Sequence, residues 1–186
     1  MAGRLAVDFG TSNTVLALWD PARQEGLPLR LSEYSRSYQQ DGSPVYVIPS
    51  LIHYAEDDRR WIGSQVIQRG LYQSQRTFRW MKRYINNRSL MKLRVNNQDI
   101  SPYKAGADFL TNILVFARDA VSFRDEEVAL AVPVEAYEHY ENWLVSVAEK
   151  AEMPRFRLID EPSAAALGYG AHIQPGNVYL LFDFGG

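Results

Sequence analysis

The chain has 186 residues, 46% of them hydrophobic and 23% charged, which is enough for one domain with a substantial core. Its net charge of -2 gives no reason to expect nucleic acid or an anionic membrane as a partner, and the absence of cysteine excludes disulfides and thiol chemistry. No signal peptide is visible and no apolar run approaches the roughly 20 residues that span a bilayer, so we expect a protein of the reducing cytoplasm.

The chain opens with two apolar runs, residues 4–8 and 14–19, that predict the strands of a hairpin. Their connection has the sequence Asp8-Phe9-Gly10-Thr11-Ser12-Asn13. Gly10 permits backbone conformations that strain other residues, and turn amides together with hydroxyl groups can hold an anion. The carboxylate of Asp8 stands at the rim of this turn, where it can hold Mg²⁺ directly or through water. Because a strand follows the turn, the motif differs from a P-loop or a dinucleotide fingerprint.

Short elements are expected through the next part of the chain. They are a strand at 29–34, a polar surface loop at 35–44, extended structure at 45–54 broken by Pro49, a charged hairpin tip at 56–60, and a helix at 64–71. Residues 77–85 are basic and aromatic; in a slightly acidic chain this composition indicates a partly buried helix rather than a nucleic-acid site. Asn96-Asn97 predicts the turn of a hairpin within residues 90–100.

Helices and strands alternate from residue 101 onward. Ser101 and Pro102 have the residue types that begin a helix, and the apolar residues that follow occupy two faces up to about Val121, which predicts a largely buried helix. The remaining expected elements are a strand at 127–132, a helix at 135–150, a strand at 155–160, a helix from Glu161-Pro162, and a strand at 177–182. This alternation predicts an α/β sheet with mixed strand directions.

The last ten residues, Asn177-Val-Tyr-Leu-Leu-Phe182-Asp183-Phe184-Gly185-Gly186, repeat the opening pattern of strand, Asp, Phe and Gly. The pair of patterns resembles the phosphate-binding turns of the actin-like ATPase superfamily. The segment Glu161-Pro162-Ser163-Ala164-Ala165-Ala166-Leu167-Gly168-Tyr169-Gly170 resembles the connecting helix of the heat-shock protein 70 chaperone family. Lys82-Arg83-Tyr84-Ile85 resembles the segment that carries that family's catalytic lysine, although Asn86 stands where the family commonly has Gly.

This resemblance implies an actin-like ATPase, or ribonuclease-H-like, lobe: a mixed five-stranded sheet flanked by helices, with a small inserted α+β subdomain. The implied division gives residues 1–40 and 112–186 to the sheet and residues 41–111 to the insertion. Because the chain ends inside a turn, we expect a fragment whose second lobe is missing.

Asp8, Glu161 and Asp183 each follow an apolar strand directly, where open α/β sheets bind ligands, and three converging carboxylates require a cation. The resemblance implies that Asp8 and Asp183 hold hydrated Mg²⁺ and that Glu161 binds a magnesium-coordinated water. It also implies that Lys82 orients or polarises the attacking water. The residues facing the phosphates of ATP or ADP would be Gly10, Thr11, Ser12, Asn13, Gly185 and Gly186.

The function that the resemblance implies is half of the ATPase domain of a chaperone, hydrolysing ATP once the second lobe completes it. Its implied partners are that lobe, unfolded client polypeptides and co-chaperones. Two alternatives stay open: a bacterial actin-like filament protein, which shares the turns, and a ribonuclease-H-like nuclease, which gathers carboxylates around two metals. The glycine turns argue against the nuclease, because a nuclease needs no phosphate cradle.

Overall fold

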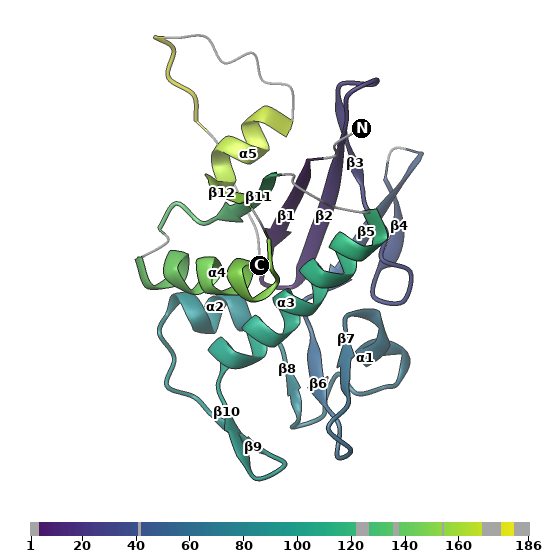
Figure 1. Ribbon diagram of the computed structural model, residues 1–186, viewed down its shortest axis with the longest axis vertical. Helices are drawn as coiled ribbons and strands as arrows, with labels where there is room; N and C mark the ends of the chain where they lie inside the picture. The colour runs from purple at the N-terminus through teal and green to yellow at the C-terminus, as the bar shows by residue number, and fades with distance from the viewer. Residues whose placement is uncertain are drawn as a thin grey trace.

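A mixed sheet forms the centre of the computed structural model, which describes residues 4–40, 42–121, 127–135, 138–153, 155–168 and 176–180 (Figure 1). Its seven strands are β1 (Leu5–Phe9), β2 (Asn13–Asp20), β3 (Glu25–Pro28), β4 (Arg36–Gln40), β5 (Ser43–Pro49), β11 (Glu127–Val132) and β12 (Arg155–Asp160). They are ordered β12-β11-β1-β2-β5-β4, and β3 also pairs with β2. β1 is antiparallel to β2 and parallel to β11, which is parallel to β12. The expected mixed α/β sheet is confirmed, although it has seven strands and not five, because β3 and the β4–β5 hairpin add to it.

The core lies between this sheet and three helices, α2 (Met81–Asn86), α3 (Pro102–Val121) and α4 (Glu138–Lys150). Side chains of β1 alternate strictly, so that Leu5, Val7 and Phe9 are buried while Ala6 and Asp8 are exposed. The ring of Phe9 lies 5.9 Å from that of Phe109 on α3 and 5.7 Å from that of Trp143 on α4, measured between centroids. These aromatic contacts fix both helices against the end of β1.

Two small antiparallel sheets lie between β5 and α3 along the chain. One contains β6 (Ile52–Tyr54), β7 (Arg60–Ile62) and β8 (Thr77–Phe78), with α1 (Ser64–Gln68) between β7 and β8. The other is the hairpin of β9 (Leu93–Val95) and β10 (Gln98–Ile100). Its turn residues Asn96 and Asn97 have φ values of 47° and 62°, the left-handed conformation that tight hairpin turns require, so the hairpin predicted there is confirmed.

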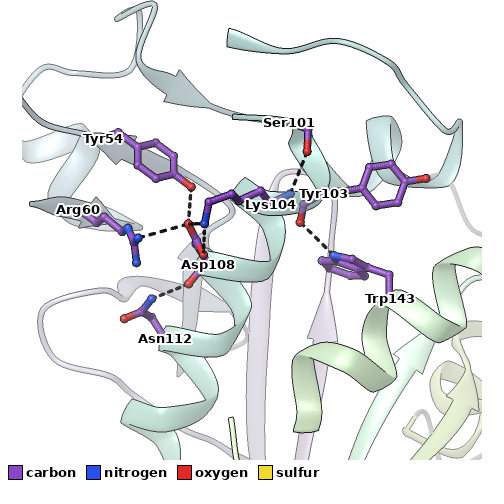
Figure 2. Close-up of polar contacts among 8 residues, drawn as sticks. All are labelled: Tyr54, Arg60, Ser101, Tyr103, Lys104, Asp108, Asn112 and Trp143. Atoms are coloured by element: carbon purple, nitrogen blue, oxygen red, sulfur yellow. Dashed lines mark hydrogen bonds and ion pairs between the residues drawn. The ribbon is translucent and has the colours of Figure 1, made fainter. Parts of the chain in front are cut away.

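A single carboxylate on α3 joins the three-stranded sheet to the core helices (Figure 2). Asp108 accepts a hydrogen bond of 2.9 Å from the Tyr54 hydroxyl on β6 and lies 3.5 Å from the Arg60 guanidinium on β7. Lys104, one helical turn earlier, lies 3.1 Å away on the same carboxylate. Asp108 is mostly buried, so these cationic and hydroxyl partners compensate its charge where water cannot.

Three expected elements differ in the structure. The third strand is β3 (Glu25–Pro28) rather than residues 29–34, because the chain turns at Leu31, whose carbonyl accepts hydrogen bonds from the amides of Tyr34 and Ser35. Residues 35–44 are not simply a loop, because β4 forms a hairpin with β5 although all its side chains are exposed. Backbone pairing is indifferent to the polar composition that suggested a loop.

The strand expected at 177–182 is also wrong in its described part, since residues 177–180 are exposed and have no strand structure. No described strand lies beside them to pair with their backbone. The helix predicted over 77–85 is shorter than expected: β8 takes its first two residues, and Trp80, at φ 57° in the left-handed region, precedes α2.

The implied division into subdomains places one boundary between residues 111 and 112, which lies inside the continuous helix α3. That division stays a prediction. Among the described residues, no helix combines the length and apolarity needed to cross a membrane.

Truncating Leu110 to alanine tests the core between the sheet and α3. Leu110 is fully buried, so Leu110→Ala should lower the free energy of unfolding by about 2–5 kcal/mol, measured by urea denaturation. Leu90→Ala makes the same chemical change at a side chain that is 93% exposed and should change the stability by less than about 0.5 kcal/mol. Equal losses in the two variants would contradict this placement of the core.

Candidate functional site

The carboxyl ends of β1, β11 and β12 lie at one edge of the sheet, because these three strands are parallel. Val7, Leu130 and Leu158 stand in register across them, so Asp8 follows that row by one residue and Glu161 by three. Two strand spacings of roughly 4.8 Å separate β1 from β12. The expectation that Asp8 and Glu161 converge at this edge is supported by the strand register.

The glycine turn after β1 is sterically possible only without a side chain at Gly10. A Cβ atom on this residue would lie 2.3 Å from the carbonyl oxygen of Asn13, a distance that real Cβ atoms do not reach. The requirement is therefore a close backbone approach rather than the freedom of φ that the sequence suggested. Thr11, Ser12 and Asn13 lie at the surface of this tight turn, with Ser12 and Asn13 exposed.

Ser50, which follows β5, fastens the turn from behind. Its hydroxyl donates a hydrogen bond of 2.8 Å to the Gly10 carbonyl and lies 3.0 Å from the hydroxyl of Thr14. Its amide donates to the Ser12 carbonyl over 2.9 Å. Ser50 and Thr14 are both buried, so the turn rests on a polar network shielded from water. The Pro49-Ser50 pair was visible in the sequence, but nothing in its composition indicated this role.

Lys82 and Glu161 form an ion pair although they are 79 residues apart in the chain. The Lys82 ammonium donates a hydrogen bond to Glu161 Oε1. Their side chains are 11% and 24% exposed, so the pair is largely removed from solvent. A lysine buried to this degree is uncommon unless a partner neutralises it. The sequence placed both residues in one site, and the structure brings them into contact.

The position of Glu161 follows from the way α5 (Glu161–Gly168) begins. Asp160, the last residue of β12, accepts a hydrogen bond of 2.8 Å from the Ser163 amide and so caps the helix. That backbone hydrogen bond lowers the pKa of the Asp160 carboxyl below its ordinary value. Glu161 is therefore the first residue of the helix, directly beyond the sheet edge.

Lys82 is placed by contacts that α2 makes with both neighbouring helices. The Tyr103 hydroxyl on α3 donates a hydrogen bond of 3.0 Å to the Ile85 carbonyl. On α4, His139 Nε2 lies 3.1 Å from the carbonyls of Ile85 and Asn86, and Arg88 Nε donates to its Nδ1 over 3.1 Å. Since a carbonyl only accepts, Nε2 carries the proton. His139 thus holds the last turn of the helix that carries Lys82.

Tyr140, next to His139 on α4, lies at the same edge of the sheet and was missed by the sequence reasoning. Burial raises the pKa of its hydroxyl above the ordinary tyrosine value, and the charges of Glu161 and then Asp8 raise it further. The hydroxyl therefore stays protonated and can donate a hydrogen bond. In the sequence Tyr140 appeared only as one of the apolar-face residues of an amphipathic helix.

A cleft of about 200 Å³ borders the glycine turn and Ser50. Thr11, Ser12 and Asn13 line it together with Arg36 and Arg79. The Arg79 guanidinium lies over the rings of Tyr72 and Trp80 and donates to the Tyr72 carbonyl. Two guanidinium groups beside exposed turn residues make this edge of the molecule locally cationic in a chain of net negative charge.

Of the predicted site residues, Asp8, Glu161 and Lys82 lie at one sheet edge and Gly10, Thr11, Ser12 and Asn13 form the adjoining turn. Asp183, Gly185 and Gly186 lie outside the residues that the structure describes. Within the described ranges, no group of three or more His, Asp or Glu side chains is arranged to hold a metal ion. A metal site of the expected composition depends on Asp183, which stays a prediction.

Replacing Ser50 by alanine should loosen the glycine turn. Ser50→Ala leaves the Gly10 carbonyl and the Thr14 hydroxyl without their buried partner, so we expect stability to fall by about 1–3 kcal/mol. Amide NMR signals of residues 10–13 should shift at the same time. Ser64→Ala is the matched control, because Ser64 is also buried and donates to the Tyr34 and Ser35 carbonyls. Turn signals that move equally in both variants would show that Ser50 has no special role.

A double-mutant cycle measures the ion pair. Lys82→Met and Glu161→Gln should each destabilise the chain, and the double variant should lose less than the sum, with a coupling of about 0.5–3 kcal/mol in urea denaturation. Arg157→Met with Glu127→Gln provides the comparison, because that pair is 3.0 Å apart but solvent-exposed. Its coupling should stay below about 1 kcal/mol. Coupling at the Lys82 pair no greater than at the exposed pair would contradict the buried contact.

The chain is similar in sequence to chaperones of one family along almost its whole length, although no family model matches it. It is 26% identical over 202 residues to the chaperone protein HscA homolog of Polynucleobacter necessarius subsp. necessarius (strain STIR1), covering 98% of this chain and 30% of that protein. It is 23% identical over 206 residues to the chaperone protein DnaK of Deinococcus deserti, covering 100% of this chain and 31% of that protein. For DnaK of Methanothermobacter thermautotrophicus the identity is 27% over 188 residues, covering 98% and 29%.

The chain thus spans about 30% of the length of these relatives. The mixed sheet, its flanking helices and the small antiparallel sheets fit the actin-like ATPase lobe expected of such chaperones. Sequence similarity over almost the whole chain and this fold lead to the same result: the chain is similar to chaperones of the heat-shock protein 70 family.

Proposed function

We propose that the chain is the N-terminal half of the ATPase domain of a chaperone of this family. In this role it binds the phosphates of MgATP at the glycine turn and hydrolyses ATP once a second lobe completes the site. The single observation that best supports the proposal is the Lys82–Glu161 ion pair, beside the strand end that carries Asp8. Lys82 and Glu161 are far apart in the sequence, charged and largely buried. Stability alone does not explain why two such charges meet at the open edge of a sheet.

The donor atoms at this edge fit a hydrated magnesium ion. Asp8 and Glu161 contribute only carboxylate oxygens, and both exert their charge on the buried hydroxyl of Tyr140. Mg²⁺ prefers oxygen ligands and usually keeps several waters, so one or two protein carboxylates with nucleotide phosphates suffice. Asp8, with Asp183 as its proposed counterpart, would hold the hydrated ion, which when bound neutralises charge on the β- and γ-phosphates. The proposed nucleotides are ATP and ADP.

The chain's own groups divide the remaining work. Thr11, Ser12 and Asn13 lie at the surface on a turn that Ser50 has already ordered, so phosphate binding there costs little backbone entropy. Gly185 and Gly186 are proposed to face the same phosphates. Glu161 would bind a water of the metal's shell, and the Lys82 ammonium would orient the attacking water and stabilise developing negative charge.

The exposed surface of α5 supports a missing second lobe. The helix has the sequence EPSAAALG and buries none of its residues, and Leu167 on it is 61% exposed. Small side chains allow two helices to approach closely. A lobe packed on α5 would cover this apolar surface and supply contacts to the nucleoside. The proposal includes the family's other partners, unfolded client polypeptides and co-chaperones, and a cytoplasmic location.

Titrating the isotope-labelled chain with MgATP while recording amide NMR signals tests the proposal. The signals of residues 10–13 should move with a dissociation constant in the millimolar range, because the chain supplies only the phosphate side of the site. Asp8→Asn should weaken the response by about tenfold or more, since it removes a charged contact. Asp57→Asn is the control, because Asp57 pairs with Arg59 on the exposed tip between β6 and β7.

Two results would contradict the proposal. One is a set of signal changes centred away from the turn, or equally sensitive to Asp8→Asn and Asp57→Asn. The other is tight binding by these 186 residues alone, which would remove the need for a second lobe.

A further inference from the structure

The Tyr140 hydroxyl is a buried polar group for which the described part of the chain offers no hydrogen-bond partner. Tyr140 is 0% exposed, and its hydroxyl oxygen has no partner among the described residues. Buried hydroxyls are nearly always hydrogen-bonded. An unpaired one has lost its hydrogen bonds to water without gaining any in the protein, which costs free energy. Each exception therefore needs an explanation, such as a partner that arrives in another state of the protein.

Aromatic packing prevents the Tyr140 ring from turning away to find a partner. The ring contacts Trp143 with 5.5 Å between centroids, and Trp143 in turn contacts Phe9 on β1. The Trp143 indole donates 3.1 Å to the Tyr103 carbonyl, which locks it to α3 (Figure 2). These contacts hold the Tyr140 ring against the aromatic cluster at the end of β1, so a hydrogen-bond partner for its hydroxyl has to move to it.

Glu161 is that movable partner. It begins α5 directly beyond the sheet edge at which β1 also ends, and its charge helps to raise the pKa of the Tyr140 hydroxyl, yet its carboxylate is held by Lys82. Glu161 lies on the first turn of α5, a helix without buried residues, whereas Lys82 lies on α2, which both α3 and α4 hold. If the ion pair opens, Glu161 can move more easily than either the lysine backbone or the tyrosine ring.

We propose that Tyr140 is a positioning residue for Glu161: when Lys82 leaves the carboxylate, the Tyr140 hydroxyl donates a hydrogen bond to it. This inference rests on the proposed function only for the event that opens the pair, the binding of an anionic phosphate by Lys82. Without Tyr140, the partly buried Glu161 carboxylate would lose the Lys82 ammonium and gain no hydrogen bond in its place. With it, the hydrogen bond formed by Glu161 offsets part of that loss, and an unpaired hydroxyl becomes paired.

A second double-mutant cycle tests the inference without any ligand. In the natural sequence, Tyr140→Phe removes a hydroxyl that has no partner, so the equilibrium constant for unfolding in urea should stay the same or fall. In a Lys82→Met background the pair is already open, and the same change should raise that constant by roughly tenfold, because a hydrogen bond to a carboxylate is lost. A purely structural role for the ring predicts no dependence on Lys82.

Tyr54→Phe is the matched control, because it removes a hydroxyl that donates to Asp108, away from the ion pair. It should raise the unfolding constant by the same factor in both backgrounds. An effect of Tyr140→Phe that is equal in the two backgrounds would overturn the proposal. If a variant does not fold, a crystal structure of the Lys82→Met chain decides instead: Glu161 within hydrogen-bond distance of Tyr140 supports the proposal, and any other placement of Glu161 refutes it.

Nucleotide binding separates this inference from the proposed function. Tyr140→Phe should weaken the MgATP response of residues 10–13 by about fivefold while leaving stability unchanged. If the natural chain shows no response to MgATP, the proposed function fails, but the cycle with Lys82→Met still decides the role of Tyr140. If the chain binds MgATP and the cycle shows no coupling, only the role of Tyr140 fails.

Discussion

The ion pair between Lys82 and Glu161 is the contact on which the site depends, because it joins the two separate parts of the chain that form it. Burying two charges costs solvation free energy that their mutual attraction recovers only in good geometry, so such a pair is weak evidence for stability. The pair is better evidence that its two charges have a role in the site. Each partner is held by elements that the rest of the fold determines: α2 by hydrogen bonds from α3 and α4, and α5 by the cap that Asp160 provides at the end of β12. The sheet, with its three parallel strands, puts Glu161 at the same edge as Asp8.

The glycine turn depends on a different kind of constraint. Its backbone closes on itself so tightly that Gly10 has no space for a side chain, and its shape is maintained by Ser50, which is 40 residues away in the chain. The turn is therefore ordered before any ligand arrives. A turn that is ordered in advance can bind an anion without a large interface, because little conformational freedom is lost on binding. Two guanidinium groups, those of Arg36 and Arg79, line the neighbouring cleft and add positive charge beside the turn.

Much of this fold could be predicted from local patterns. The opening hairpin, the Asn96-Asn97 turn, the two-sided helix after Pro102 and the alternation of strands with helices all appear where periodicity and turn residues indicated. The errors share one cause, which is that strand pairing depends on a neighbour and not on composition. Residues 36–40 form a strand because β5 lies alongside them. Residues 177–180 form none, and no described strand lies beside them. In the site, Lys82 and Glu161 carried a recognisable pattern, whereas Ser50 acts through hydrogen bonds to residues distant in sequence, which local patterns do not record.

The lack of any buried residue on α5 has a consequence for how the molecule responds to disturbance. A helix held by its cap, its strand and one ion pair opens at a lower free energy than the core beneath it. Glu161 sits at its first position, so the carboxylate can be withdrawn and returned by local fraying while the sheet and the three core helices stay folded. The charge that this edge presents can thus vary without any cost to the integrity of the scaffold.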